Sequence, residues 1–235
     1  MKQKSECEQP DLKGNAKTNK RINKSTNNHY QMSILIYAES AEGKFKKVAF
    51  ELASYAKKVA ADLGTTVTAV TVNAGDVSEL SKYGVDKVLK ISNDKLSGFT
   101  AKAYADAIKQ AAQKENVKLV LLSSTTDSLY LAPLVAVALD AGFASNVVGL
   151  PISTNPFQVK RNAFSNKAFN ITEINTDVKV LSLAKNSYGI FENASSMATE
   201  DFSPSISDAD YGVKVQTEKK SSGKVTIADA DIVVS

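Results

Sequence analysis

The sequence predicts an α/β fold, in which a parallel sheet forms the middle of a three-layer, nucleotide-binding-like domain with an antiparallel β-hairpin at its edge. Short apolar runs alternate with longer amphipathic segments from residue 33 to residue 142, which is the pattern of strands connected by helices. After Pro151, apolar and polar residues alternate singly, which indicates the hairpin. The 43% hydrophobic and 23% charged residues are typical of a globular protein.

The first strand–helix–strand unit follows Met32. The apolar run 34–37 predicts a strand, residues 43–63 predict a helix, and the run 67–72 predicts a second strand. Apolar residues of the helix recur at three- and four-residue steps, whereas lysines such as Lys46 take the opposite side. One face of this helix is therefore expected to pack on the sheet and the other to face solvent.

The alternation of strands and helices continues to Gly142. Further elements are predicted at residues 77–83 (short helix), 87–91 (strand), around Tyr104 and Ile108 (helix), and 119–122 (strand). Residues 129–140 are apolar almost all round, which predicts a buried helix with a glycine stop at Gly142. Pro133 is expected to distort the first turn of this helix.

Two further β runs follow Pro151. Phe157 and Val159 alternate with polar neighbours, and the apolar run 178–183 follows the turn-like residues 175–177. We predict that these two runs pair as the antiparallel hairpin and extend the sheet at one edge.

Shifts in composition predict four segments. Residues 1–31 form a basic, polar leader with few large apolar side chains, which predicts disorder. Residues 32–190 are predicted to form the first domain. Residues 191–212 are acidic and rich in serine, which predicts a mobile linker at a domain boundary. Residues 213–235 end on an apolar, strand-like run and predict the start of a second α/β domain that is cut short.

The net charge of +4 comes from the leader. Seven of the 29 basic and three of the 25 acidic residues lie in residues 1–31, which leaves 22 of each in the rest of the chain. Because the rest of the chain has no excess of basic residues, we do not expect a nucleic-acid partner. The longest apolar stretch, 129–139, is too short to cross a bilayer, so we expect no membrane insertion and a cytoplasmic protein.

The residue types that most catalytic and metal sites need are absent after Met32. Cys7 and His29 are the only cysteine and histidine, and both lie in the leader. The body therefore lacks a Ser-His or Cys-His pair, a thiol nucleophile and the usual zinc ligands. Closely spaced glycines, which cradle phosphates, are also missing, since the nearest pair is Gly142 and Gly149. We assign no catalytic, cofactor-binding or metal-binding residue, and we do not expect an enzyme.

Two polar segments lie at carboxyl ends of predicted strands, where α/β sheets bind ligands. The hydroxyls of residues 123–128 could hold a phosphate or a ribose, but the simpler interpretation is that Asp127 or Ser128 caps the next helix. Glu39 could contact a nucleotide or a partner, but a solvated loop or helix start is simpler. The tyrosines of the body that we interpret as packing residues are Tyr37, Tyr55, Tyr83 and Tyr104.

Five strings of the sequence are specific when they are taken together. They are Met32–Glu39 (MSILIYAE) before a long helix, Leu131–Leu139 (LAPLVAVAL), Ser145–Val148 (SNVV), Phe157–Phe164 (FQVKRNAF) and Val178–Ser182 (VKVLS). In order and spacing they resemble the N-terminal domain of the electron transfer flavoprotein alpha subunit, over residues 32 to about 190. The family commonly has Gly-Arg or Gly-Lys before the proline-containing helix, whereas residues 127–130 here are Asp-Ser-Leu-Tyr, so an anion contact from this loop is not carried over.

The resemblance implies one half of a heterodimer. Such a protein shuttles electrons from acyl-CoA and other dehydrogenases, as in fatty acid β-oxidation, through FAD to a quinone reductase. This chain would supply the N-terminal scaffold domain and an interface to the beta subunit. Residues 230–235 resemble the first strand of the family's flavin domain, which continues with a Gly-Gly-Arg-Gly turn. The FAD contacts would thus lie after Ser235, and no flavin is expected on this chain.

One alternative keeps the same fold class. A stand-alone adenine-nucleotide-binding α/β protein of the universal-stress-protein type would use the hydroxyls of residues 123–128 for phosphates. The missing glycine motif counts against it. A hydrolase is disfavoured by the absence of histidine and cysteine from the body.

Overall fold

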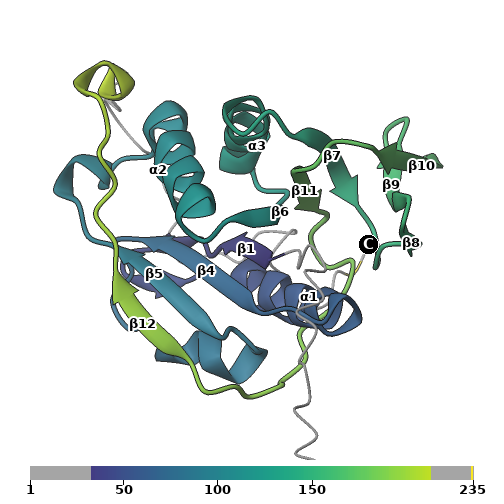
Figure 1. Cartoon of the computed structure of the whole chain (residues 1–235), viewed down its shortest axis with the longest axis horizontal. Helices are drawn as coiled ribbons and strands as arrows, with labels where there is room; N and C mark the ends of the chain where they lie inside the picture. The colour runs from purple at the N-terminus through teal and green to yellow at the C-terminus, as the bar shows by residue number, and fades with distance from the viewer. Residues whose placement is uncertain (1–32, 213–233, 235) are drawn as a thin grey trace, which may run out of the picture. The chain divides into compact units, whose positions relative to one another are not determined.

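The computed structural model describes residues 33–212 and residue 234 of the chain (Figure 1). The predicted leader at 1–31 and nearly all of the predicted second domain at 213–235 lie outside the described residues. The strands are β1 (Ser33–Tyr37), β2 (Ser40–Ala41), β3 (Lys44–Phe45), β4 (Val67–Val72), β5 (Lys87–Ile91), β6 (Val117–Ser123), β7 (Gly142–Val147), β8 (Ser153–Thr154), β9 (Phe157–Ala163), β10 (Ala168–Ile174), β11 (Lys179–Leu183) and β12 (Ala198–Asp201). The α-helices are α1 (Lys47–Leu63), α2 (Ala101–Lys114) and α3 (Thr126–Ala138), and the short 3₁₀ helices are η1 (Ser78–Tyr83), η2 (Asp94–Leu96) and η3 (Asp208–Tyr211).

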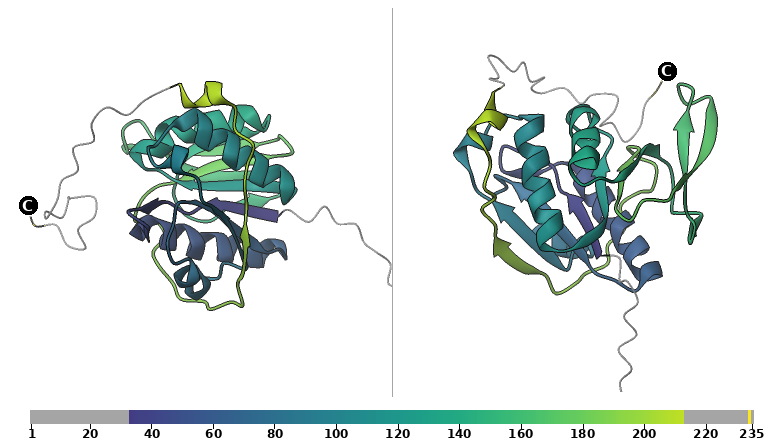
Figure 2. Two further views of the ribbon diagram at one scale, coloured as in Figure 1. Left: turned by 90° about the vertical axis from the view of Figure 1, so that its left-hand side faces the viewer. Right: turned by 45° about the horizontal axis from the view of Figure 1, so that its top comes forward.

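A mostly parallel sheet lies between two helical layers. Its strand order is β10-β9-β7-β11-β6-β1-β4-β5-β12, and every neighbouring pair from β7 to β12 is parallel. Ile34 and Ile36 of β1 pack in the cluster that contains α1, whereas Leu35 and Tyr37 pack in the cluster that contains α2 and α3. Helix α1 therefore covers one face and α2 and α3 cover the other (Figure 2). The predicted three-layer α/β class is confirmed.

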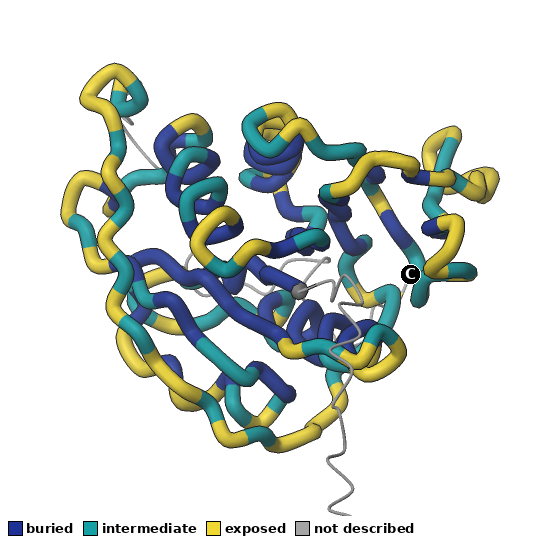
Figure 3. Tube along the Cα trace, in the orientation of Figure 1, coloured by how far each residue is buried: buried dark blue, intermediate teal, exposed yellow. Residues whose placement is uncertain are grey.

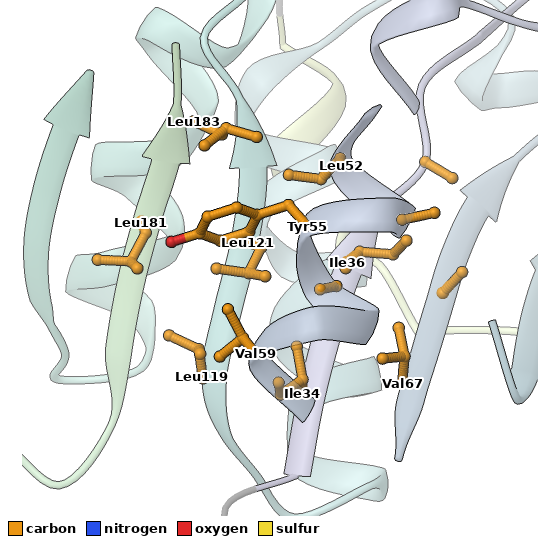
Figure 4. Packing of buried hydrophobic residues seen from close by; sticks show 14 of the residues in the cluster. Ile34, Ile36, Leu52, Tyr55, Val59, Val67, Leu119, Leu121, Leu181 and Leu183 are labelled. Atoms are coloured by element: carbon orange, nitrogen blue, oxygen red, sulfur yellow. The ribbon is translucent and has the colours of Figure 1, made fainter. Parts of the chain in front are cut away.

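Burial on both faces explains why the central strands are continuous apolar runs. All residues of β4 and of β11 are buried, as is usual for parallel strands covered by helices on each side. On the α1 side, Leu52, Tyr55 and Val59 lie over the sheet residues (Figure 4). Burial of each such large side chain stabilises the fold by roughly 1.5–3 kcal/mol. Helix α1 is therefore held mainly by its apolar face.

Helix α1 begins four residues later than the sequence predicted. Residues 40–45 form a small antiparallel hairpin of β2 and β3, whose turn holds Glu42 and Gly43 at φ values of 52° and 78°. Glycine suits this left-handed conformation because it has no Cβ. The polar and charged residues of the predicted first turn belong instead to this hairpin. Lys46 is the N-cap residue of α1, outside the helix.

Helix α3 is only half buried, which corrects the prediction of a buried helix. Leu129 and Val137 expose 62% and 82% of their surface, while the opposite side packs on α2 and the sheet. The helix also ends at Ala138 and not near Gly142, which is the first residue of β7. An apolar stretch without periodicity does not indicate which of its sides is covered.

The hairpin exists at the sheet edge, but its second strand was predicted wrongly. β9 pairs antiparallel with β10, through the turn at residues 164–167. The run predicted as its partner is β11, which lies between β6 and β7 and is parallel to both. All residues of β11 are buried, which suits a strand in the middle of the sheet, whereas most residues of β10 are exposed, which suits a strand at its edge.

Residues 184–212, which we call the strap, are not the loose linker that was predicted for 191–212. β12 pairs parallel with β5 and forms one edge of the sheet. Glu200 of β12 bonds to Lys87 and Lys114, and hydrogen bonds from Lys114 and then Lys87 lower the pKa of its carboxyl to about 2. Asp208 and Asp210 likewise form ion pairs with Lys95 and Lys102. The domain boundary in this region stays a prediction.

Glu51 of α1 holds the start of the strap. This residue is 4% exposed, and its carboxylate accepts hydrogen bonds from the backbone N–H groups of Asn186 (2.9 Å), Tyr188 (2.9 Å) and Gly189 (3.1 Å). One turn later, the Ser54 hydroxyl accepts from the Phe191 N–H at 3.0 Å. A carboxylate on the apolar face of a helix is stable because these N–H donors replace its hydration.

We predict that Glu51→Ala lowers the free energy of unfolding by about 3 kcal/mol, because three amides lose a charged acceptor. Glu51→Gln should cost about 1–2 kcal/mol, since its amide oxygen can still accept. Urea unfolding followed by circular dichroism measures both changes. Asp62→Ala, which removes an exposed (i, i+4) pair with Lys58, is the control and should cost less than about 0.5 kcal/mol. A Glu51→Ala cost no larger than that of the control contradicts the assigned role.

Candidate functional site

The order in which the chain adds strands to the sheet reverses between β1 and β6. From β1 the chain adds β4 and β5 toward one edge, whereas β6, β11 and β7 lie toward the other. In open α/β sheets such a switch point leaves a crevice at the carboxyl ends of the strands, where ligands bind. Glu39 follows β1 and Thr125 follows β6, so both lie at this switch point.

The buried carboxylate of Glu39 lies at this switch point. Glu39 is 2% exposed and accepts hydrogen bonds from the Thr125 hydroxyl at 2.5 Å and the Ser128 hydroxyl at 3.1 Å. Its other oxygen lies 2.9 Å from Nζ of Lys46. Because each oxygen has a donor, the buried charge is compensated.

The same carboxylate lies at the beginning of α3. Thr125 is the N-cap residue of this helix, and its hydroxyl oxygen accepts from the Ser128 N–H at 3.2 Å. A helix N-terminus attracts anions through its unpaired N–H groups and its dipole. The chain's own carboxylate therefore takes the place that would otherwise favour a phosphate.

Two sequence interpretations of this region need correction. Glu39 does not lie in a solvated loop or helix start, because the hydroxyls of α3 and the ammonium of Lys46 enclose it. The helix cap is Thr125, two or three residues before the predicted Asp127 or Ser128, since its extended backbone (φ −96°, ψ 169°) aims the hydroxyl back at the first turn.

Lys46 is the residue that the sequence did not indicate. It was assigned to the solvated side of a helix that was expected to begin at Gly43. Because α1 begins at Lys47, the backbone N–H of Lys46 instead donates to the Glu39 carbonyl at 3.0 Å, and its ammonium reaches the carboxylate. The turn-forming Glu42-Gly43 pair was the available signal for this reversal of the chain.

The neighbouring hydroxyls are also bonded within the protein. The Ser123 hydroxyl donates to the Val48 carbonyl at 3.2 Å, and the Ser124 hydroxyl donates to that of Ser182 at 3.0 Å. Ser182 in turn accepts from the Asn146 N–H at 3.3 Å. These bonds join the ends of β6, β7 and β11 to each other and to α1.

The tyrosines pack as the sequence predicted. Tyr37, Tyr55 and Tyr104 are buried, and Tyr83 is partly buried against the α1 cluster. The rings of Tyr37 and Tyr104 meet edge to face with centroids 6.2 Å apart, and the Tyr104 hydroxyl donates to the Leu96 carbonyl at 2.8 Å. Burial, together with the charge of Asp127, raises the pKa of Tyr104 to about 12. This hydroxyl is therefore a structural donor at neutral pH.

A nucleotide phosphate at the N-terminus of α3 would compete with Glu39 for the same hydroxyl groups. An anion at the α3 N-terminus would lie beside the Glu39 carboxylate, and displacing Glu39 would leave the hydroxyls of Thr125 and Ser128 without their acceptor. In residues 33–212 and 234, no three His, Cys, Asp or Glu side chains gather as a metal site. None of the described helices has the length and apolar character needed to cross a membrane.

Comparison with known proteins gives a consistent match. A family model described as "Electron transfer flavoprotein domain" matches residues 34–207. The chain is 30% identical to the electron transfer flavoprotein subunit alpha of Thermoanaerobacterium thermosaccharolyticum, over 86% of this chain and 64% of the relative. It is 25% identical to the subunit of the same name from Bacillus subtilis, over 86% of this chain and 63% of the relative. The chain thus spans just under two thirds of the length of these relatives.

A further relative carries the name of a reductase subunit. The acryloyl-CoA reductase electron transfer subunit beta of Anaerotignum propionicum is 28% identical, over 53% of this chain and 35% of the relative.

We predict that Glu39→Ala lowers the free energy of unfolding by about 3 kcal/mol, because a buried acceptor of two hydroxyls and an ammonium is lost. Glu39→Gln, which keeps the shape but not the charge, should cost about 1–2 kcal/mol. Chemical denaturation measures both. The matched control is Glu79→Gln on the exposed surface of η1, with an expected cost within about 0.5 kcal/mol. Equal costs for Glu39→Ala and the control would show that the crevice does not depend on Glu39.

Proposed function

Because this chain belongs to the electron transfer flavoprotein family, we propose that it is the N-terminal scaffold and subunit-interface domain of an alpha-type subunit. The observation that supports this best is the family match over residues 34–207, together with alpha subunits that align over 86% of the chain. The division into a domain at 32–190, a boundary within 191–212 and a second domain from 213 is part of the proposal.

In this proposal the intact protein carries electrons and does not itself catalyse a reaction on a substrate. We assign its FAD to residues outside 33–212, because the switch-point crevice is occupied by Glu39 and its donors. The role of residues 33–212 is then to present a rigid surface to the other subunit. The helices on both faces of the sheet and the strap tied to Glu51 support such a role.

The redox partners follow from the same proposal. We propose that electrons arrive from acyl-CoA and other dehydrogenases, as in fatty acid β-oxidation, and leave to a quinone reductase, with a beta-type subunit as the permanent partner in the cytoplasm. The relative from Anaerotignum propionicum is named an electron transfer subunit of acryloyl-CoA reductase, which supports electron exchange with an enzyme that acts on a CoA thioester. Nucleic acid and membrane are not among the proposed partners.

The stand-alone nucleotide-binding alternative has less support. It needs an anion site at the carboxyl edge of the sheet, where the hydroxyls of Ser124, Thr125 and Ser128 are bonded within the protein. Membership of the electron transfer flavoprotein family also favours the subunit role.

We predict a one-to-one complex when this chain is co-expressed with the beta-type subunit of the same organism. Size-exclusion chromatography with light scattering gives its mass, and calorimetry of the chain alone should give no heat with AMP or ATP. A chain that stays free of the beta subunit and binds ATP or AMP at micromolar concentration would sink the subunit proposal and favour the alternative.

A further inference from the structure

The strap is anchored differently along its two parts. Residues 184–201 bond to buried or backbone groups of the body, beginning with Glu51 and Ser54, which are 4% and 5% exposed. The Asn193 N–H donates to the Lys82 carbonyl at 2.7 Å, and β12 then pairs with β5 along its whole length. Buried and backbone hydrogen bonds of this kind are little affected by dissolved salt. The first part of the strap is therefore fixed to the body.

Residues 202–212, which we call the latch, are attached at the surface. The Phe202 N–H donates to the Lys90 carbonyl at 2.8 Å, and within the described residues this is the last backbone hydrogen bond between the strap and the sheet. Every residue of the latch is exposed or intermediate in burial (Figure 3). Beyond Phe202 the latch is therefore held by side chains alone.

Two ion pairs hold the short helix η3 of the latch. Nζ of Lys95 lies 2.9 Å from Asp208, and Nζ of Lys102 lies 2.8 Å from Asp210. The two lysine side chains are 65% and 68% exposed, and that of Asp208 is 90% exposed. Charges so open to water attract each other weakly, and salt screens them. The strength of this attachment therefore depends on ionic strength.

The other contacts of the latch define one docked position on α2. The Gln110 amide donates to the Ser205 carbonyl at 2.7 Å, and its oxygen accepts from the Ser205 N–H at 2.9 Å. Ile206 and Tyr211 pack, partly buried, against the cluster that contains α2 and α3. All of these contacts lie on the outside of α2, so they can separate without disturbing the core.

The docked latch fixes the point from which the chain continues past residue 212. Lys102 belongs to the first turn of α2, so its pair with Asp210 delivers Gly212 to the beginning of that helix (Figure 1). An extended chain spans at most about 3.3–3.6 Å per residue, so release of residues 202–212 would add up to about 35 Å of reach. Docking and release therefore give the following segment two very different ranges.

We propose that the latch detaches from α2 as a unit when salt screens its ion pairs, while residues 184–201 stay bound to the body. Detachment breaks the two ion pairs and the Gln110 contacts but no pairing between strands. Such a local opening needs far less free energy than global unfolding. The proposal goes beyond the scaffold role and uses it only for the purpose of the device, because in an alpha-type subunit the next segment leads to the second domain.

Hydrogen–deuterium exchange on the full chain tests the release. The rates are compared at about 0.01 M and about 1 M KCl, where the Debye length is about 30 Å and about 3 Å. We expect the amides of residues 205–210 to exchange about 5-fold faster at high salt, because the docked fraction falls. Those of residues 186–201 should keep their rates, and they serve as the reference in the same sample.

A pair of double variants separates the latch from a general effect of charge. Lys95→Gln with Lys102→Gln should exchange rapidly at residues 205–210 even at low salt, and should lose the dependence on salt. The control is Lys44→Gln with Lys58→Gln, which removes the same charge from exposed positions on β3 and α1. The control should behave as the unchanged chain does. All four lysines are exposed, so both variants are expected to fold, and circular dichroism checks this.

A distance measurement distinguishes detachment from local loosening. Spin labels are attached at Gly212→Cys and Lys109→Cys on α2, in a chain that also carries Cys7→Ser, and their separation is measured by double electron–electron resonance. We expect one narrow distribution at low salt and a broader, longer one at high salt.

Three results would overturn the proposal. Equal exchange of residues 205–210 at both salt concentrations would show that the ion pairs do not control docking. An unchanged distance distribution would show that the latch does not leave α2. If residues 186–201 and 205–210 speed up together, the strap opens as one segment and has no separate latch. None of these results affects the subunit role, which fails only if the chain does not bind the beta-type subunit.

Discussion

The buried carboxylate of Glu39 fixes what the carboxyl edge of this sheet can do. It joins the end of β1 to the first turn of α3 through the hydroxyls of Thr125 and Ser128, and to the start of α1 through Lys46. The three elements that border the switch point are thus tied to one charge. The position that α/β proteins usually leave for an anion is here filled by a carboxylate of the chain itself.

A second buried carboxylate, that of Glu51, holds the start of the strap. Glu51 binds the backbone of the strap, which continues to β12 at the far edge of the sheet. The strap therefore covers the β5 edge, whereas within residues 33–212 β10 pairs with no strand other than β9.

The parts of the fold that could be predicted from the sequence are those set by local pattern. The runs at 34–37 and 67–72 are strands, and the amphipathic helix between them ends at Leu63, because the period of the apolar residues and the burial of both strand faces are visible in the residue types. The residue types of a strand do not show which other strand it pairs with. β10 was missed and β11 was placed in the hairpin because pairing depends on residues far apart in the chain.

The candidate site was harder to predict than the fold. Glu39 and residues 123–128 were recognised as a carboxyl-edge pair, but their mutual contact depends on β1 and β6 being neighbours, which alternation alone does not specify. Lys46 was missed because a two-residue turn moved the helix start. Glu51 carried a signal, a charge on the apolar face of α1, but the backbone N–H groups that donate to it lie more than a hundred residues later.

Hydrogen–deuterium exchange on the full chain, with and without AMP or FAD, tests most directly whether Glu39 closes the switch point. We expect the amides of residues 123–128 to exchange at the same rate with either nucleotide, because the hydroxyls of Thr125 and Ser128 already bind Glu39. Protection of residues 123–128 by either nucleotide would contradict this account.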